Sequence, residues 1–328
     1  MARPGKPETQ GQGTADIVRL EYTYPSASGL GEIYARGWMI NGVAPKALVH
    51  VVHGMAEHGE RYEAFARALC REGYALWAAD LIGHGRSAQT DEDLGWFGES
   101  GGWLSFVNDT KRLNDHLRRL YPDIPIVLFG HSMGSFVARA YCARYGGELA
   151  GAVFCGTSGR NPATAAGILA ARLMITFRGG RHRSELLDTA AFGTYNKKYS
   201  GKPRTKFDWL NTDPAQVDRY LADERCGFLF TAAGMLDMMG LLQNVSRQNW
   251  FQSVPYRLPM LLIAGEDDPV GDDGKGVRQV YRELKESGHN NTSCKIFPGM
   301  RHEILLEPRR QEVYDAIFAW LAAALPKE

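Results

Sequence analysis

Six short apolar runs, separated by segments of helical pattern, constrain the fold of this 328-residue chain more than any other feature. The runs are ALVHVVHG, YALWAAD, PIVLFG, GAVFCG, PMLLIAG and SCKIFPG. Helices are expected to start near Arg61, Gly101, Met133, Gly274 and Pro308. Continuous apolar runs are typical of strands buried on both faces, and their alternation with helices is typical of a parallel sheet. We therefore predict an α/β fold with a mostly parallel central sheet and helices on both faces.

The first 40 residues have a different pattern. The segments 17–25 (IVRLEYTYP) and 32–40 (EIYARGWMI) are rich in β-formers, and the turn formers SASGLG lie between them. This arrangement predicts an antiparallel pair of strands. Residues 1–16 are polar, are rich in Gly and Pro, and lack the apolar core of a secretory signal. We expect them to form a disordered tail, and we expect the protein to be cytoplasmic.

The alternation of strands and helices is interrupted once, between Thr157 and about Tyr256. Short helical patches replace strands there, and a structureless loop of that length is implausible inside a compact domain. We predict a helical cap, or lid, inserted over the ends of the strands. The predicted division is a tail over 1–16, an α/β core over 17–157 and 257–328, and a cap segment over 158–256.

The composition disfavours several classes of protein. The chain has 38 Lys and Arg against 37 Asp and Glu, and its net charge of +1 argues against binding to nucleic acid. The apolar stretches 165–177 and 227–242 contain charged residues and are too short to span a bilayer. The five cysteines are odd in number and widely spaced, which predicts free thiols rather than a disulfide framework.

The sequence Gly-His-Ser-Met-Gly, residues 130–134, lies where a predicted strand turns sharply into a predicted helix. Glycines on both sides allow such a tight turn, in which the central serine has a strained backbone. The helix that starts at Met133 directs its free N–H groups and the positive end of its dipole toward the serine. Ser132 is therefore a candidate nucleophile.

Two later segments supply a candidate acid and a candidate base. AGEDDPVG (264–271) and FPGMRHEILLE (297–307) each follow a predicted strand, where open parallel sheets place their sites. A serine nucleophile requires a histidine to take its proton, and an acid to hold that histidine in the right tautomer. Ser132, an aspartate near 268 and His302 follow one another in the order nucleophile, acid, base.

The segment His53-Gly54-Met55 follows the strand that ends near Val52. A turn at this point would bring the backbone N–H of Met55 beside that of Met133. Two such donors can stabilise the oxyanion that forms when a serine attacks a carbonyl.

Together these motifs resemble the cap-bearing serine hydrolases of the α/β-hydrolase fold that include monoacylglycerol lipases and bacterial lysophospholipases. The matching segments are HGMAEH (53–58), GHGRS (83–87), GHSMG (130–134), GEDDPV (265–270) and GMRHE (299–303). The resemblance implies that Ser132 is the nucleophile, His302 the base and Asp268 its orienting acid, with Met55 and Met133 as oxyanion donors. The chain departs from the pattern at Ala56, where monoacylglycerol lipases commonly have glycine.

Several neighbouring residues admit other interpretations. Asp267 competes with Asp268 on position, whereas Asp272 or Asp273 is expected to cap the next helix. Glu57 and His58 form only one acid–histidine pair, which is too little for a metal site, and we expect neither a metal nor a cofactor. Hydrogen bonding within the oxyanion loop is the expected role of this pair. His53, Glu57 and His131 are candidate substrate contacts.

The cap segment carries two further signals. Apolar residues of this segment could line an acyl tunnel, or could simply pack the cap; they include Ile168, Leu169, Met174, Phe177, Phe228, Phe230, Met235 and Met238. Between residues 160 and 206 there are ten basic residues and two acidic ones. Transient contact with an anionic membrane surface and an ordinary solvated helical surface both explain this bias.

We therefore predict a serine hydrolase that cleaves carboxylic esters of lipids, of the monoacylglycerol or lysophospholipid type, through an acyl-serine intermediate. The same triad serves other small acyl substrates, so an esterase, a thioesterase and an aminopeptidase are alternatives. A ligand-binding protein without catalysis on the same fold is an alternative of another class. The expected partner is a small lipid-like ester, and the sequence does not indicate an oligomeric state.

Overall fold

The computed structural model describes residues 16–199, 203–247 and 249–325. The tail predicted over 1–16 lies, apart from Asp16, outside the described residues. The strands are β1 Ile17–Pro25, β2 Glu32–Ile40, β3 Leu48–Val52, β4 Ala75–Ala79, β5 Ile126–His131, β6 Gly151–Cys155, β7 Met260–Gly265 and β8 Thr292–Phe297. They form one sheet in the order β1-β2-β4-β3-β5-β6-β7-β8. The β1–β2 and β2–β4 pairings are antiparallel and the other pairings are parallel, which confirms the predicted sheet.

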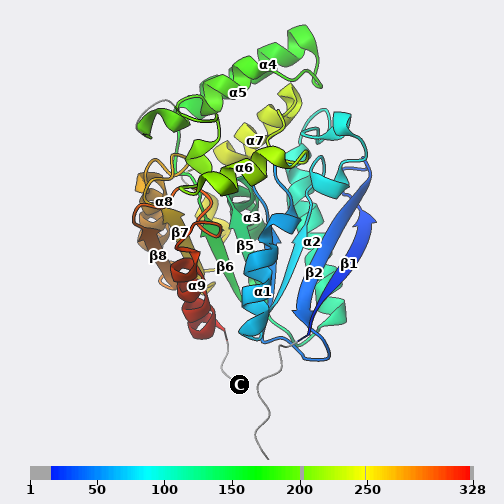
Figure 1. Cartoon of the computed structure of the whole chain (residues 1–328), viewed down its shortest axis with the longest axis vertical. Helices are drawn as coiled ribbons and strands as arrows, with labels where there is room; N and C mark the ends of the chain where they lie inside the picture. Colours follow the sequence, from blue (N-terminus) through cyan, green and yellow to red (C-terminus); the bar gives the residue numbers. More distant parts are fainter. Residues whose placement is uncertain (1–15, 200–202, 248, 326–328) are drawn as a thin grey trace, which may run out of the picture.

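Helices cover both faces of this sheet (Figure 1). Helices α1 Glu63–Arg71 and α9 Arg310–Ala324 lie on one face, and α2 Gly102–Leu120, α3 Met133–Tyr145 and α8 Lys275–Glu286 lie on the other. Each of the five helices begins within two residues of its predicted start. The layers and the mostly parallel sheet are those of the predicted α/β fold class.

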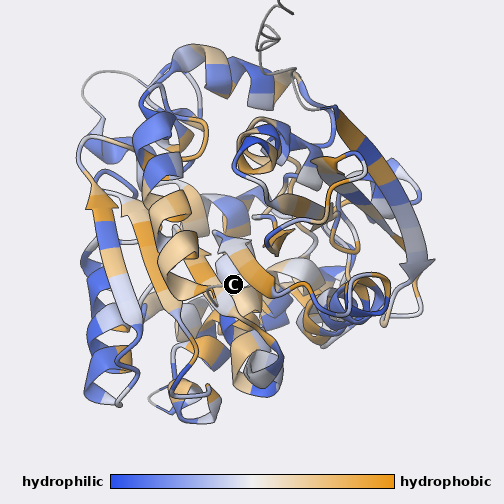
Figure 2. Ribbon diagram, turned by 90° about the horizontal axis from the view of Figure 1, so that it is seen from below, coloured by the Kyte–Doolittle hydropathy of each residue, from blue (hydrophilic) through white to orange (hydrophobic). Residues whose placement is uncertain are grey.

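The strands have apolar side chains on both sides because two separate cores must be filled. In β5, Leu128 packs with Val137 of α3, whereas Phe129 points to the opposite face and packs with Phe65 of α1. Figure 2 shows the hydrophobic strands in orange in the middle of the molecule. Side chains that alternate between two buried faces read as one continuous apolar run. The runs that predicted the sheet therefore reflect burial under two helical layers.

The segment between β6 and β7 contains α4 Ala163–Arg178, α5 Glu185–Phe192, α6 Pro214–Ala222 and α7 Ala232–Val245. Helices α4 and α5 lie farthest from the sheet, beyond the carboxyl ends of its parallel strands (Figure 1). Helix α7 is packed between α4 and α3 of the core. The division at 157/158 and 256/257 stays a prediction. None of the helices in the described part of the chain has the length and apolar composition needed to cross a membrane.

Buried Arg139 of α3 contacts the start of this segment and the end of its last α-helix. Its guanidinium donates to the carbonyl of Ser158 at 2.9 Å and to the carbonyl of Val245, the last residue of α7. The same group lies 4.4 Å from the ring centroid of Trp250. Burial lowers the pKa of Arg139 to about 9. Arg139 therefore holds residue 158 and the end of α7 against the core helix that begins after Ser132.

All five cysteines have free thiols, as predicted.

Candidate active site

Ser132 lies at a sharp turn between β5 and α3, as the sequence predicts. Its backbone has φ 53° and ψ −123°, a conformation that non-glycine residues rarely adopt. A Cβ on Gly130 would lie 2.3 Å from the carbonyl oxygen of Gly134, and a Cβ on Gly134 would lie 2.1 Å from that of Val52. The motif therefore needs both glycines for steric reasons. The strained turn presents Ser132 at the carboxyl edge of the sheet.

His302 and Asp268 form a buried pair. His302 Nδ1 lies 2.9 Å from Asp268 Oδ1, and the same oxygen accepts the backbone N–H of Val270 at 2.9 Å. Their side chains are 2% and 0% exposed. Because Asp268 Oδ1 accepts the hydrogen bond from Nδ1 of His302, Nε2 of the histidine is available for a substrate or a serine hydroxyl. His302 and Ser132 line the same cavity.

The neighbouring acids are directed elsewhere. Asp267 Oδ1 pairs with Lys198 Nζ at 2.6 Å, and the same ammonium pairs with Asp273 Oδ1 at 3.0 Å. Asp272 and Asp273 have positive φ values of 49° and 53°. The N-cap of α8 is Gly274, so the prediction that one of these aspartates caps the helix is wrong. A left-handed backbone differs from the extended conformation that a capping side chain requires.

The loop after β3 packs directly against Ser132, since a Cβ on Gly54 would lie 3.1 Å from the Cβ of Ser132. Met55 in this loop lines the cavity together with Met133, whose backbone opens α3. Ala56 has a positive φ of 50°. This left-handed conformation explains why a glycine suits the position in similar enzymes. The Ala56 carbonyl accepts Gly227 N–H at 3.0 Å and Tyr220 O–H at 2.9 Å.

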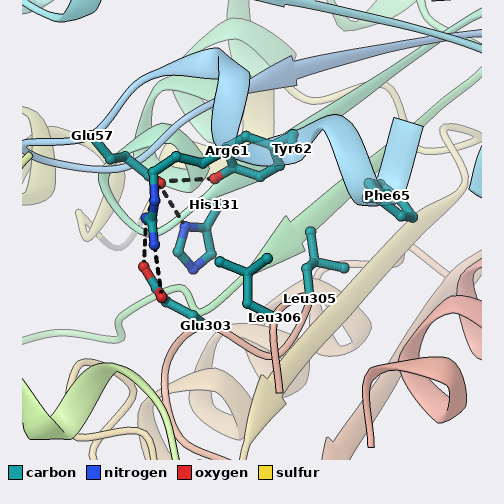
Figure 3. A pocket seen from close by; sticks show the side chains of 8 residues that line it. All are labelled: Glu57, Arg61, Tyr62, Phe65, His131, Glu303, Leu305 and Leu306. Carbon is teal, nitrogen blue, oxygen red and sulfur yellow. Dashed lines mark hydrogen bonds and ion pairs between the residues drawn. The ribbon is translucent and has the colours of Figure 1, made fainter. Parts of the chain in front are cut away.

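Glu57 fixes that loop through its hydrogen bonds, and its carboxylate faces Arg61, Tyr62 and His131 (Figure 3). Its Oε1 accepts Gly54 N–H at 2.6 Å and Tyr62 O–H at 2.9 Å, and its Oε2 accepts from Arg61 Nη1 at 2.6 Å. Arg61 also donates to Glu303, at 2.6 and 3.0 Å. The prediction that this pair forms hydrogen bonds within the loop is confirmed for Glu57 and wrong for His58, whose Nε2 lies 2.8 Å from Asp223 Oδ2 in the cap segment. Two buried carboxylates share one guanidinium, and through it they join the Met55 loop to the His302 loop.

His131, beside the serine, faces acceptors on both sides. Its Nδ1 lies 3.2 Å from Glu57 Oε1 and its Nε2 lies 3.3 Å from the carbonyl oxygen of His302. Burial alone would lower the pKa of His131, but the hydrogen bond and the charge of Glu57 raise it. Burial likewise acts to raise the pKa of Glu57, and His131 with Arg61 holds it well below its usual range. The geometry fits an imidazolium that donates from both nitrogens.

His53 does not line the cavity. It is fully buried, its Nε2 lies 2.9 Å from the N–H of Leu81, and its Nδ1 lies 2.8 Å from the carbonyl oxygen of Gly54. Nε2 therefore accepts and Nδ1 donates, which is the pattern of a neutral imidazole. Burial lowers the pKa of His53, in agreement with that pattern. Its contacts support the loop and leave no nitrogen for a substrate.

A cavity of about 1020 Å³ extends from Ser132 into the cap segment. Among the predicted substrate contacts, Glu57 and His131 line it. Its apolar lining comes from Phe136, Gly167, Ala170, Leu187, Ala191, Phe192, Phe228, Met238, Met239 and Leu242. Of the predicted tunnel residues, Phe228 and Met238 line it, whereas Ile168, Leu169, Met174, Phe177, Phe230 and Met235 do not. The tunnel prediction is therefore right for two residues and wrong for the face of α4 that meets the cavity.

Sequence reasoning missed Trp209, which belongs to the cap segment. Its ring lies 5.1 Å from that of His302, at an angle of 45°, and it lines the cavity. The backbone N–H of Trp209 donates to Asn196 Oδ1 at 2.9 Å. The surrounding sequence has no periodicity that would have singled out this tryptophan. The imidazole of His302 is thus packed between Trp209 and His131, whose ring centroid is 4.8 Å away.

Comparison with known proteins places this geometry in a family. The sequence model of the Hydrolase_4 family, described as serine aminopeptidase S33, matches residues 43–309. The human monoglyceride lipase is 29% identical over 292 residues, which cover 87% of this chain and 84% of the lipase. The monoglyceride lipase homolog of monkeypox virus is 32% identical over 281 residues, covering 84% of this chain and 90% of the homolog.

Solved structures give the same result. A thermostable carboxyl esterase from Bacillus coagulans, in complex with glycerol, is 29% identical with a TM-score of 0.87, over 94% of this chain and 99% of the esterase. A lipase in its open form is 25% identical with a TM-score of 0.85, over 94% of this chain and 100% of the lipase. This chain therefore belongs to the Hydrolase_4 family and is a serine hydrolase with the α/β-hydrolase fold.

Proposed function

We propose that this enzyme hydrolyses carboxylic esters of lipids, of the monoacylglycerol or lysophospholipid type, through an acyl-enzyme on Ser132. One observation carries the proposal: the cavity that contains Ser132 and His302 continues into the cap segment with a surface that is more apolar than polar. Its volume of about 1020 Å³ is at the upper end of small-molecule sites. The similarity to monoglyceride lipases and to the phospholipase YtpA of Bacillus subtilis supports the same substrate class.

In the proposed acylation step, His302 takes the hydroxyl proton of Ser132 as its oxygen attacks the ester carbonyl. Asp268, bonded at 2.9 Å, holds the imidazole in orientation and stabilises the imidazolium. The backbone N–H groups of Met55 and Met133 donate to the oxyanion. His302 then protonates the leaving alcohol, and the acyl group remains on Ser132.

Deacylation repeats these steps with water. His302 takes a proton from the water, whose oxygen attacks the acyl carbon, and the imidazolium returns the proton to Ser132. The released products are a carboxylic acid and a free enzyme. No metal or cofactor enters the proposed mechanism.

Two carboxylates of the cavity are not free to bind the ammonium group that an aminopeptidase substrate carries. Glu57 and Glu303 line the cavity, and both are hydrogen-bonded to Arg61. Glu57 also lies 3.2 Å from Nδ1 of His131, whose pKa it raises, so that Arg61 and His131 together match the two negative charges. Asp188 and Asp272 line the cavity as well, so aminoacyl amides belong in the substrate panel.

A fluorophosphonate probe and a substrate panel test the proposal. We expect one adduct on Ser132, and we expect monoacylglycerols or lysophospholipids to be cleaved faster than thioesters or aminoacyl amides. Ser132→Ala should lower kcat by about 10⁶-fold, as the loss of a triad serine can. Ser287→Ala, at the end of α8, is the control. Absence of an adduct on folded protein would instead favour a ligand-binding protein without catalysis.

We further propose that the outer face of α4 and the start of α5 contact a lipid surface transiently. Leu169, Leu173 and Phe177 recur at intervals of four residues, and they are 59%, 51% and 78% exposed. Leu186 of α5 is 72% exposed. An apolar stripe of this kind is typical of an interfacial helix. Arg172 and Arg178 flank it, whereas Arg181 is already paired with Asp93.

Vesicle sedimentation tests the lipid contact. The Leu173→Asp, Phe177→Asp double variant should lose most of its binding to phosphatidylcholine vesicles while retaining the hydrolysis of a short, soluble ester. Leu120→Asp alters a leucine that is 52% exposed at the end of α2, and should bind vesicles as the wild type does. If the double variant binds vesicles as strongly as the wild type does, the outer face of α4 is not the lipid contact. A preference for anionic vesicles at low salt would assign an additional role to the arginines.

A further inference from the structure

The loop after β3 carries a cluster that the proposed ester hydrolysis does not use. His58 Nε2 lies 2.8 Å from Asp223 Oδ2, although 165 residues separate the two. Cys226 joins them, and the ligand atoms of all three residues lie within 4.8 Å of one another. His58 is buried, and the other two are half-buried. The sequence around His58 does not reveal this cluster. Asp223 and Cys226, the other two members, belong to the turn after α6 and are distant along the chain.

That turn holds its side chains in place through its own backbone. Cys226 N–H donates to the carbonyl of Asp223 at 2.9 Å, and Arg225 N–H donates to Asp223 Oδ1 at 2.9 Å. Oδ1 is thereby engaged, and Oδ2 is directed to His58. The next residue, Gly227, donates to the carbonyl of Ala56 at 3.0 Å. The loop after β3 and the turn after α6 are thus fixed to each other before any ion binds.

The three donor atoms suit one metal above others. An imidazole nitrogen, a carboxylate oxygen and a thiolate are all zinc ligands, at about 2.0–2.3 Å from the ion. Tetrahedral angles at those bond lengths place ligand atoms roughly 3.3–3.8 Å apart. The 2.8 Å contact between His58 and Asp223 needs to open by only about 1 Å. We propose that His58, Asp223 and Cys226 form a zinc site whose fourth ligand is water.

The surrounding charges permit a divalent cation. Arg61 is the nearby cation, and it is hydrogen-bonded to both Glu57 and Glu303. Arg61 and the imidazolium of His131 match these two carboxylates, and Asp223 adds a further negative charge. The arginine therefore does not leave the cluster with an excess of positive charge. Zinc would join the turn after α6 to the loop that contains Met55, and it would take no part in the attack on the ester.

Cobalt spectroscopy tests the site on the full chain. Protein dialysed against a chelator is titrated with Co²⁺, and the near-ultraviolet thiolate-to-cobalt charge-transfer absorption is recorded. We expect one Co²⁺ per chain, displaced by one equivalent of Zn²⁺. Cys226→Ser should abolish the absorption, and Asp223→Asn should weaken Zn²⁺ binding about 10–100-fold. Cys294→Ser, another half-buried thiol, is the matched control and should bind as the wild type does.

The proposal fails if the wild type shows no charge-transfer absorption, or if Cys226→Ser retains it. It also fails if Zn²⁺ does not displace Co²⁺. Hydrogen exchange on the wild type provides a second measurement in case a variant does not fold. Zn²⁺ should slow exchange in residues 223–227 and 56–59, and unchanged exchange in both segments would contradict the site. Because none of these readouts involves ester hydrolysis, the zinc site and the proposed function can fail independently.

Discussion

Arg61 and Glu303 are joined by two hydrogen bonds, of 2.6 and 3.0 Å, across 242 residues of sequence. Glu303 directly follows His302, and the same Arg61 Nη1 contacts Glu57 at 2.6 Å. One buried guanidinium therefore sets the distance between the loop that contains Met55 and the loop that contains His302. The candidate base and a candidate oxyanion donor depend on this single side chain for their relative position.

Arg61→Lys should lower kcat/KM by about 10-fold or more and destabilise the protein by about 1–3 kcal/mol. A lysine ammonium cannot reach both carboxylates with the geometry of a guanidinium. Steady-state kinetics and urea unfolding measure the two effects. Arg67→Lys, in an exposed pair with Glu63 on α1, is the matched control and should change neither value. Full activity in Arg61→Lys would show that the two loops keep their positions without this bond.

Gly156→Ala should impair the reaction more than it impairs folding. A Cβ there would lie 3.0 Å from His302 Cε1 and 3.2 Å from its Nδ1, and the residue has a φ of +60°. We expect a loss of about 1–2 kcal/mol in stability from the left-handed backbone. A displaced imidazole should reduce kcat by about 10–100-fold.

Gly42→Ala separates these two effects. Gly42 has a φ of +69°, and a Cβ there would meet no atom within 4 Å. The Gly42→Ala variant should therefore lose stability but keep its kcat. If Gly156→Ala and Gly42→Ala both have a normal kcat, a methyl group at position 156 does not disturb catalysis by His302. The space beside the imidazole is then not needed for the reaction.

Asp237→Asn should stabilise the protein at neutral pH. Asp237 is 4% exposed, it accepts Gly102 N–H at 2.9 Å, and burial raises its pKa to about 6. A carboxyl whose folded pKa is raised contributes stability below its unfolded pKa near 4, and that stability is lost as the pH rises through about 6. The variant should therefore exceed the wild type by about 1–3 kcal/mol at pH 8 and match it at pH 4. A constant difference in urea unfolding across this range would refute the assignment.

Ala170→Trp should shorten the acyl chains that the enzyme accepts, because Ala170 lines the cavity. Each excluded methylene costs about 0.8 kcal/mol of binding, so long-chain esters should lose far more kcat/KM than short ones. Leu221→Trp, on α6 and 46% exposed, lies outside the cavity lining and should leave the chain-length profile unchanged. Identical profiles for the two variants would place the acyl chain outside this cavity.

The sheet and the candidate triad could be predicted because strand burial appears as a local apolar run, and the order of the three residues can be read directly along the chain. The run at Ile126–His131 is apolar on both faces, and Ser132, Asp268 and His302 follow strands in a fixed order. The face of α4 could not be predicted, because ATAAGILAARLMITFR has small or apolar residues on every side. The contact of Trp209 with His302 and that of His58 with Asp223 depend on how the cap segment folds back. No periodicity in the sequence records this.

Ala56 stands next to Met55, and its carbonyl oxygen accepts from Tyr220 of α6 and from Gly227 in the turn after α6. Lifting α6 and this turn away from the core would break both hydrogen bonds and remove the support of the left-handed backbone, whose φ is 50°. We therefore expect the proposed oxyanion site to assemble only while this part of the cap segment is seated. An enzyme built in this way would be quiescent when open, and it would acquire its reactivity from the act of enclosing a substrate.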